Sequence, residues 1–254
     1  FLVPKYLLDS DKKPTITNNV KTISIEKKMG LHGSPTAVLE YAGSIGWIVG
    51  NPNDGMRAMF TMMNNARLGV GIQGLSQAEV SYQQAINFAK NRKQGRSLIK
   101  DGFNTILDHA DVRRNLLLMR CLTLVSRAIC FETAMAIDLS KQENSEELRD
   151  RAAFLTPIAK AFSTDSGCRV AELAVQVHGG MGYIRDTGVE QFYRDVRITA
   201  IYEGTNGIQA MDLVGRKLSK NGKTAKALIK EIENTEKACA KTNSFSPEII
   251  KKIK

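Results

Sequence analysis

The pattern of apolar and polar residues changes at about residue 54. Downstream of that point, apolar residues recur at every third or fourth position, as in Leu75, Ala78, Tyr82, Ala85 and Ala89. Because this spacing places them on one face of an α-helix, it predicts a long amphipathic helix.

Two further long helices are predicted downstream. One runs from about Asp111 to Leu139, and the other runs from Ser145 to Val177, with the carboxylates of Glu146 and Glu147 in its first turn. A fourth helix is expected to begin at Thr205, whose side chain can cap it. These helices can form an antiparallel four-helix bundle, so the fold class is predicted to be mainly α.

Residues 1–55 are the only part of the chain for which the sequence predicts β-structure. Short apolar or alternating runs at 22–25, 37–41 and 47–49 are separated by Gly, Ser and Pro. Three such strands are too few to close a barrel.

The composition is that of a globular protein. The 254 residues, of which 43% are apolar, can bury a sizeable core in one large domain or two small ones. No apolar run approaches the roughly 18 residues of a membrane span, and the first residues lack the basic start and cleavage site of a signal peptide. Neither the four cysteines nor the three histidines have the spacing of a metal site, and the cysteines are expected to be reduced thiols in the core. The chain begins with Phe1, which suggests a piece of a longer protein.

The net charge of +10 favours anionic partners. These could be nucleic acid, or a nucleotide cofactor and coenzyme A, which both carry phosphates. Much of the excess lies in the tail 217–254, where a solvated charged face is the favoured explanation. Within this tail, 219–223 is predicted to be a linker and 224–240 a charged helix.

A glycine motif inside the first helix invites a different interpretation. Residues 69–74 match the G-x-G-x-x-G pattern of dinucleotide-binding turns, but that fingerprint requires a preceding strand, whereas 62–67 is predicted to be helical. Close packing between helices is the better explanation for these glycines.

The best candidate for chemistry lies near the end of the helical region. Glu203 follows the apolar pair Ile201-Tyr202 and precedes Gly204-Thr205, so its carboxylate is expected where an apolar wall meets a helix start. Apolar surroundings raise the pKa of a carboxylate towards working pH, which suits a group that abstracts a proton. The alternative is an ordinary solvated loop residue.

The motifs around Glu203 resemble the C-terminal signature of the acyl-CoA dehydrogenases. The segments that carry the resemblance are Gln176-x-x-Gly179-Gly180-x-Gly182-Tyr183, Tyr193-Arg194-Asp195-x-Arg197 and Ile201-Tyr202-Glu203-Gly204-Thr205, with upstream matches at 29–36, 65–71 and 88–96. The resemblance covers about Lys21 to about Leu218. It implies three regions: the last strands of an antiparallel β-barrel domain (1–54), the helical C-terminal domain (55–218) and a basic helical tail that begins a C-terminal extension (219–254).

The resemblance also implies roles for eight residues. Glu203 would be the catalytic base, Arg67 and Gly204 would lie at the acyl-CoA, and FAD would be bound by Arg92, Gln176, Gly179, Gly180 and Thr205. From the residues alone, Arg67 could equally be a surface arginine, and Gln176 could be a helix-terminal cap. The chain departs from the family pattern in carrying Asn64 where an acidic residue is usual, and Gly95-Arg96 where Phe-Gly is commoner. The second departure makes the chain more similar to the longer bacterial branch of the family.

The implied activity is FAD-dependent dehydrogenation of an acyl-CoA to the 2-enoyl-CoA. A homodimer or homotetramer is expected, with FAD contacts shared across subunits, an electron-transfer flavoprotein as acceptor and a cytoplasmic location in a bacterium. Two alternatives remain open: a nucleic-acid-binding member of the same superfamily, and a non-catalytic helical interaction module.

Overall fold

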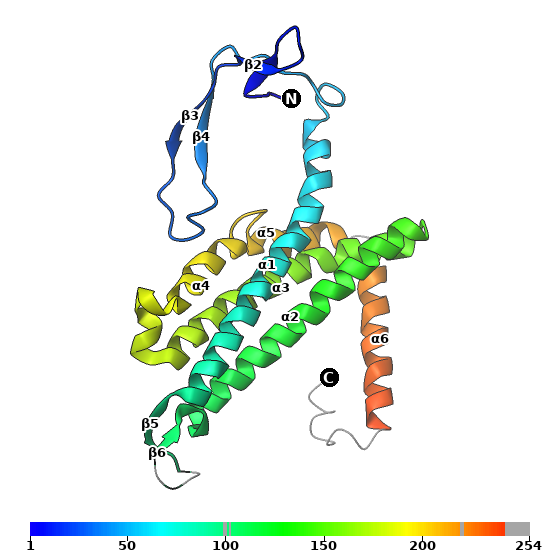
Figure 1. The fold of residues 1–254 in the computed structure, drawn as a ribbon. Helices are drawn as coiled ribbons and strands as arrows, with labels where there is room; N and C mark the ends of the chain where they lie inside the picture. Colours follow the sequence, from blue (N-terminus) through cyan, green and yellow to red (C-terminus); the bar gives the residue numbers. More distant parts are fainter. Residues whose placement is uncertain (99–100, 102, 219–220, 242–254) are drawn as a thin grey trace.

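The computed structural model describes residues 1–98, 101, 103–218 and 221–241. Three long helices form its main body: α1 (Gly55–Asn91), α2 (Ala110–Gln142) and α3 (Glu146–His178). They pack side by side in antiparallel order, and α3 contacts both of the others along its length (Figure 1). Each predicted long helix is therefore confirmed, with ends within three residues of those expected.

The core between the helices is built from small residues on α1 and larger ones opposite. Ala78, Ala85 and Ala89 of α1 are fully buried against Met119 of α2 and Val170 of α3. Alanine side chains allow the backbones of neighbouring helices to lie close together. A substitution that changes the side-chain volume here would therefore disturb the packing. This apolar face is the one that the spacing of α1 predicted.

Glycines bring α1 and α3 still closer. A Cβ on Gly74 would lie 2.5 Å from the carbonyl oxygen of Ser163, and one on Gly167 would lie 2.6 Å from that of Gly74. The explanation by helix packing is thus confirmed for Gly74, and Gly71 has Ala159 as a similarly close neighbour. It is wrong for Gly69, which faces open space.

The fourth side of the bundle is made of short segments. After the 3₁₀ turns Gly179–Tyr183 and Arg185–Thr187, helix α4 (Val189–Val196), a 3₁₀ turn (Arg197–Ala200) and α5 (Asn206–Asp212) lie across α3. The fold is mainly α, as predicted. The helix expected to begin at Thr205 does begin there, but after Asp212 it continues only as one π turn, Leu213–Lys217.

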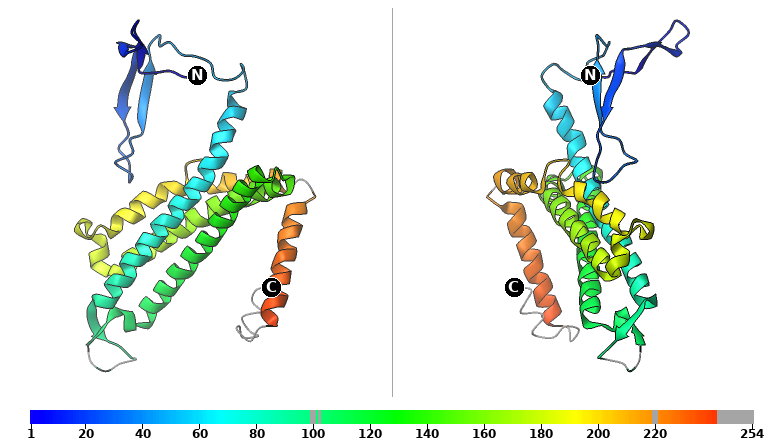
Figure 2. Two further views of the ribbon diagram at one scale, coloured as in Figure 1. Left: turned by 45° about the vertical axis from the view of Figure 1, so that its right-hand side comes forward. Right: turned by 90° about the vertical axis from the view of Figure 1, so that its left-hand side faces the viewer.

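The N-terminal segment forms two small antiparallel sheets beyond the start of α1 (Figures 1 and 2). One pairs β1 (Tyr6–Leu8) with β2 (Pro14–Thr17), and the other pairs β3 (Val20–Ile25) with β4 (Ala37–Tyr41). The run 47–49 was predicted to be a strand, but only Trp47 pairs, in a single bridge with Leu2. No closed barrel is formed within the described ranges.

The prediction that β-structure is confined to the first 55 residues is wrong. A hairpin of β5 (Lys93–Arg96) and β6 (Phe103–Thr105) joins α1 to α2, followed by the 3₁₀ turn Ile106–Asp108. The sequence of β5, Lys93-Gln94-Gly95-Arg96, has little β propensity. The pairing arises because the end of α1 and the start of α2 hold the two strands next to each other.

Helix α6 (Lys223–Ala240) stands away from the bundle (Figures 1 and 2). Salt bridges of Arg151 on α3 connect α6 to the bundle: Arg151 pairs with Glu231 of α6 at 2.7 Å and with Glu132 of α2 at 2.9 Å. The predicted charged helix is confirmed. Part of the predicted linker, 219–220, lies outside the described residues, and the division into three regions stays a prediction.

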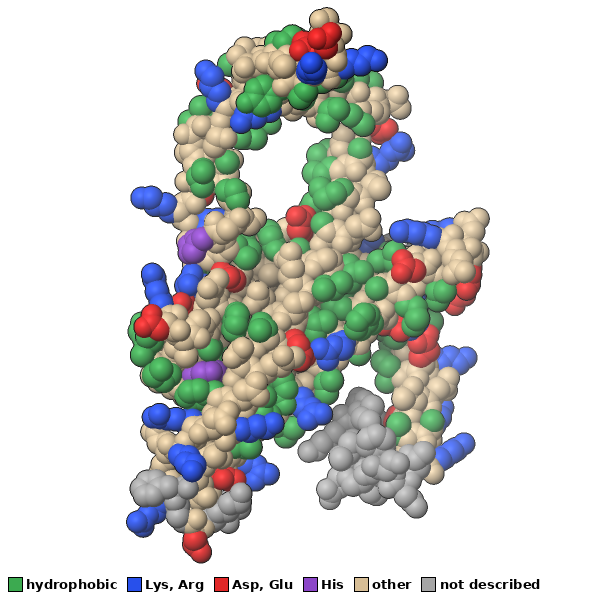
Figure 3. All heavy atoms as spheres, viewed as in Figure 1, with side chains coloured by type: hydrophobic (Ala, Val, Ile, Leu, Met, Phe, Trp, Pro, Cys, Tyr) green, Lys and Arg blue, Asp and Glu red, His purple; other side chains and the backbone are tan. Residues whose placement is uncertain are grey.

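The outer face of α2 is apolar and exposed (Figure 3). Residues spaced along one stripe point away from the core: Leu117, Cys121, Leu124, Ala128, Phe131 and Met135. The expectation of core thiols therefore holds for the buried Cys130 but is wrong for Cys121. Within the described ranges, every helix is too short or too polar to span a lipid bilayer.

Candidate functional site

Glu203 occupies a left-handed turn between the 3₁₀ turn Arg197–Ala200 and α5. Its φ is +55° and that of Gly204 is +85°. Thr205 then caps α5, with its hydroxyl accepting from the Ile208 N–H at 3.3 Å, as predicted. The turn leaves the Glu203 side chain half-buried, at the start of a helix.

The carbonyl groups of this turn are held from below by side chains of other elements. The Lys160 ammonium, on α3, donates to the Gly204 carbonyl at 2.9 Å and to Asn206 Oδ1 at 2.9 Å. The Gln209 amide donates to the Gly204 carbonyl at 3.0 Å and to the Glu203 carbonyl at 3.3 Å. Both side chains are almost completely buried.

Arg67 lies under the same turn. Its Nε donates to the Glu203 carbonyl at 3.4 Å, and its Nη1 pairs with Asp212 Oδ2 at 2.9 Å, while Asp212 Oδ1 accepts from Arg216 at 2.6 Å. Arg67 is only 4% exposed, so the alternative of an ordinary surface arginine is wrong. The buried guanidinium is compensated by a carboxylate that is itself buried.

Burial lowers the pKa of Lys160 from 10.5 to about 8. The positive charge of Arg67 acts in the same direction, whereas the carboxylates of Asp165 and Glu203 act against it. Lys160 is therefore a cation at neutral pH, and the neighbouring groups compensate its positive charge only in part.

An apolar cavity lies next to the two residues that precede Glu203. Ile201 and Tyr202 border a cavity of about 600 Å³ together with Met29, Leu31 and Ile198. The Tyr202 hydroxyl donates to Gln73 Oε1 of α1, and burial raises the pKa of this phenol.

Two of the motifs that resemble the family meet at this cavity. The Asp195 carboxylate accepts from the Leu31 N–H at 2.7 Å, and Arg194 donates to the Met29 carbonyl at 3.0 Å. Gly30 has no room for a side chain, since a Cβ there would lie 2.6 Å from Asp195 Oδ1. These contacts tie the loop between β3 and β4 to α4.

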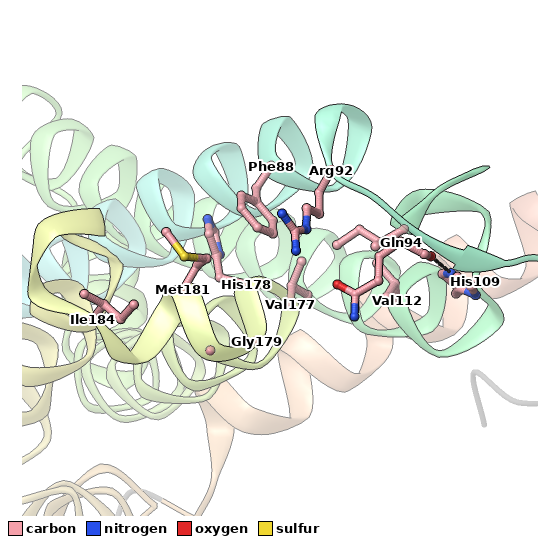
Figure 4. Close-up of a pocket in the computed structure, with 13 residues that line it drawn as sticks. Phe88, Arg92, Gln94, His109, Val112, Val177, His178, Gly179, Met181 and Ile184 are labelled. Carbon is pink, nitrogen blue, oxygen red and sulfur yellow. Dashed lines mark hydrogen bonds between the residues drawn. The ribbon is translucent and has the colours of Figure 1, made fainter. Parts of the chain in front are cut away.

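A second candidate site lies at the far end of α3 (Figure 4). A cavity of about 750 Å³ is bordered by Arg92, at the end of α1, and by Gly179 and Gly180, at the end of α3. The Arg92 side chain points towards Phe88 and Val177, and its guanidinium makes no hydrogen bond or ion pair within the described part of the chain. Gly179 closes α3 with φ +60°, and a Cβ on Gly180 would meet nothing within 4 Å.

His178, which the sequence did not predict to be a site residue, forms part of the wall of this cavity. Its ring is stacked on Phe88 with centroids 4.4 Å apart, and its Nδ1 lies 2.8 Å from the Ala174 carbonyl. Burial lowers the pKa of this imidazole. Nδ1 therefore donates to the carbonyl, and Nε2 of the neutral ring is left as an acceptor.

Gln176 does not share the cavity of Arg92. It borders a neighbouring hollow with Tyr183, Arg185 and Tyr193. Its side chain is exposed and makes no hydrogen bond among the described residues, so the alternative that it caps the helix is wrong. It is the Gln176 backbone carbonyl that accepts from the Gly179 N–H.

The eight predicted residues thus fall into two groups. Arg67, Glu203, Gly204 and Thr205 meet over the middle of α3, whereas Arg92, Gln176, Gly179 and Gly180 lie around its C-terminal end. At 1.5 Å per residue, the 18 residues from Lys160 to His178 separate the groups by about 27 Å.

Sequence reasoning missed Lys160, Gln209 and Asp212. The spacing of α3 could have identified Lys160, since it is in step with the buried residues Thr156, Ser163, Thr164 and Gly167. A lysine in a buried helical stripe needs a partner. Gln209 and Asp212 likewise share one face of α5.

Comparisons with known proteins agree with the geometry. Residues 53–218 match the family model described as acyl-CoA dehydrogenase, C-terminal domain. The chain is 42% identical to 3-methylmercaptopropionyl-CoA dehydrogenase of Ruegeria pomeroyi, over 100% of this chain and 44% of that protein. It is 35% identical to a butyryl-CoA dehydrogenase of Syntrophomonas wolfei, over 91% of this chain and 40% of that protein.

Among solved structures, butyryl-CoA dehydrogenase from Megasphaera elsdenii superposes with a TM-score of 0.67 at 28% identity, covering 79% of this chain and 49% of that one. The chain therefore spans less than half the length of these relatives.

Proposed function

Because the chain belongs to the acyl-CoA dehydrogenase family, in its longer bacterial branch, we propose that the protein containing it converts an acyl-CoA to the 2-enoyl-CoA. In this reaction Cα of the acyl group loses a proton and Cβ loses a hydride. Glu203 takes the proton from Cα. FAD, when bound, supplies the acceptor for the hydride.

The observation that carries this proposal is the Glu203 turn. Glu203 lies between Ile201 and Tyr202, which border an apolar cavity, and the start of α5, and the backbone of the turn is held by Lys160, Gln209 and Arg67. A base works best when its position is fixed before the substrate arrives. No other carboxylate among the described residues combines a left-handed backbone with such support.

The residues at the end of α3 fit the phosphate-bearing part of FAD. A guanidinium without a protein partner suits the bidentate recognition of phosphate, and the exposed backbone at Gly179 and Gly180 allows a ligand to come close. We assign Arg92, Gly179 and Gly180 to this part, with Gln176 at its edge. Thr205 is assigned to the other group, near the phosphates of the FAD that serves Glu203.

The distance of about 27 Å between the two groups supports a homo-oligomer, in which one chain contributes to two FAD molecules. The exposed apolar stripe of α2, from Leu117 to Met135, offers a surface for such assembly. A homodimer or homotetramer is therefore proposed, with an electron-transfer flavoprotein as acceptor.

Arg67 and Gly204 are proposed to lie at the thioester end of the acyl-CoA. Their support is position, since Gly204 follows Glu203 and Arg67 touches the Glu203 carbonyl. The hydrogen bonds of Arg67 are directed to the protein, so its part is to shape the site from beneath.

The test uses the full-length protein with its natural cofactor. Butyryl-CoA and 3-methylmercaptopropionyl-CoA, the substrates named for two relatives, are added without oxygen, and the absorbance of the oxidised flavin is followed. Bleaching by either one, with formation of the 2-enoyl product, is expected. If a panel of acyl-CoA thioesters produced no bleaching while DNA bound with steep salt dependence, the nucleic-acid alternative would take its place.

A further inference from the structure

A lysine lies fully buried beneath the turn that carries Glu203. Lys160 is 0% exposed, and its ammonium donates to the Gly204 carbonyl and to Asn206 Oδ1, both at 2.9 Å. Burying an ammonium is unfavourable unless it gains strong hydrogen bonds in return. The bonds gained here are made to the turn itself.

A second buried group reaches the same turn. Gln209 is 1% exposed, and its amide nitrogen donates to the carbonyls of both Gly204 and Glu203. Its Oε1 has no hydrogen-bond partner among the described residues. The Gln209 amide thus serves the turn through its donors, even though its acceptor is left unpaired.

The carbonyls that receive these bonds belong to the two left-handed residues. A residue with a Cβ rarely adopts the φ of +55° seen at Glu203. Such a conformation persists where the surroundings over-determine it, and this is common at functional sites. The hydrogen bonds from Lys160 on α3 and Gln209 on α5 hold the turn in this conformation.

We propose that Lys160 and Gln209 are positioning residues for Glu203. They hold the peptide groups on either side of Gly204, so that the Glu203 carboxylate stands at one place and in one orientation. None of their four hydrogen bonds is made to the carboxylate itself. This inference rests on the proposed function, in which Glu203 takes the proton.

The geometry explains why a loose turn would slow the reaction. Rotation of the 203–204 or 204–205 peptide would swing the carboxylate without moving the helices below. A displacement of about 1 Å can cost about a hundredfold in rate. Substrate binding would be affected far less, because the turn is proposed to contact only the thioester end of the acyl-CoA.

The experiment compares Lys160→Met and Gln209→Met with the wild type in the full-length protein. Both changes keep the approximate length of the side chain and remove the donors. Gln209→Met also removes an unpaired buried oxygen, so this variant should fold even if Lys160→Met does not. Met119→Ala on α2 is the matched control, since it opens the core without touching the turn.

Two readouts are taken. Amide hydrogen exchange is measured by mass spectrometry on peptides covering residues 198–212, and kcat is measured alongside the dissociation constant of acyl-CoA. We expect exchange in this segment to accelerate at least about tenfold in each Met variant, and kcat to fall about 10- to 100-fold with little change in acyl-CoA binding. Met119→Ala should leave unchanged both the hydrogen exchange of this segment and the ratio of kcat to the dissociation constant of acyl-CoA.

Unchanged exchange in the variant that folds would overturn the proposal, and so would faster exchange with an unchanged kcat. The exchange readout needs no substrate. If the wild type failed to dehydrogenate any acyl-CoA, the proposed function would fall, while exchange would still show whether Lys160 and Gln209 hold the turn.

Discussion

The Glu203 turn and the Arg92 cavity are both supported by α3, yet they are built in opposite ways. At the turn, the charged and polar groups are partnered within the protein: Lys160 holds Gly204 and Asn206, and Arg67 is paired with Asp212. At the cavity, the Arg92 guanidinium has no partner among the described residues, and Gly180 presents bare backbone.

The difference corresponds to two kinds of task. A group that takes part in bond breaking has to be fixed in advance, because reorganisation during the reaction raises the barrier. A group that recognises phosphate can remain unpaired until its ligand binds, because the ligand carries the opposite charge. A site whose backbone is held by buried donors and an open site with an unpaired cation are therefore expected in the same protein.

The strongest test of the comparison is Glu203→Gln in the full-length protein. The amide keeps the shape of the carboxylate but cannot accept the Cα proton, so turnover should fall by about two to four orders of magnitude. Acyl-CoA and FAD should still bind. The rate is measured with saturating acyl-CoA and a dye acceptor, and a variant that kept more than about a tenth of the wild-type rate would place the base elsewhere.

A second change loosens the turn without touching the carboxylate. A Cβ on Gly204 would have to tolerate φ +85° and would lie 3.0 Å from Gln209 Nε2, whereas one on Gly207 would be at ordinary contact distance from Thr205. Gly204→Ala should therefore lower kcat about 10- to 100-fold. Gly207→Ala is the matched control and should stay within about twofold of the wild type, on the ordinary cost of a surface substitution. Equal losses in the two variants would show that the left-handed turn is not what matters.

At the open site, the expected effect is on affinity. Arg92→Ala should raise the dissociation constant of FAD about 10- to 100-fold, since a hydrogen bond to a charged group is worth about 1.5–3 kcal/mol. Activity should return when FAD is in excess, which distinguishes this change from those at the turn. Lys93→Ala, on the adjacent exposed strand, is the control, and an identical loss there would point to general charge and not to a specific contact.

The smallest expected effect concerns pH. Burial lowers the pKa of Lys160 from 10.5 to about 8, while the unfolded chain keeps the ordinary value. Between those values the unfolded state binds more protons, so the contribution of Lys160 to the free energy of unfolding rises with pH and is least favourable below about pH 8. The groups that face Lys160 are Arg67, Asp165 and Glu203.

This rise is measured as the difference between the wild type and Lys160→Met in urea unfolding from pH 7 to 10.5. The gap between the two curves is a difference in free energy of unfolding, and it should shift in favour of the wild type as the pH rises. The shift should be equivalent to a few degrees in Tm, since 1 kcal/mol corresponds to about 2–4 °C for a protein of this size. Lys141→Met, at an exposed position, serves as the control. A gap that stays constant with pH would mean that Lys160 does not titrate in this range.

The sequence by itself determined the features that depend on near neighbours. Apolar residues three and four positions apart fixed the three long helices, and Ser145 and Thr205 begin helices because their side chains accept from an N–H three residues later. The placing of Glu203 between an apolar pair and a helix start follows from the same local chemistry. The resemblance of its motifs led to the family that the comparisons show.

Only the tertiary structure decided what lies beneath and beside those residues. Lys160 and Gly204 are 44 residues apart in sequence, and Arg67 and Asp212 are 145 apart, so neither pair is visible before α1, α3 and α5 are packed. The same holds for the β5–β6 hairpin and for the separation of Gln176 from the Arg92 cavity, which depend on how helix ends meet. Propensity and spacing act over a few residues, whereas contacts between distant residues are set by the packing of whole helices, and that packing determines which buried charges find partners.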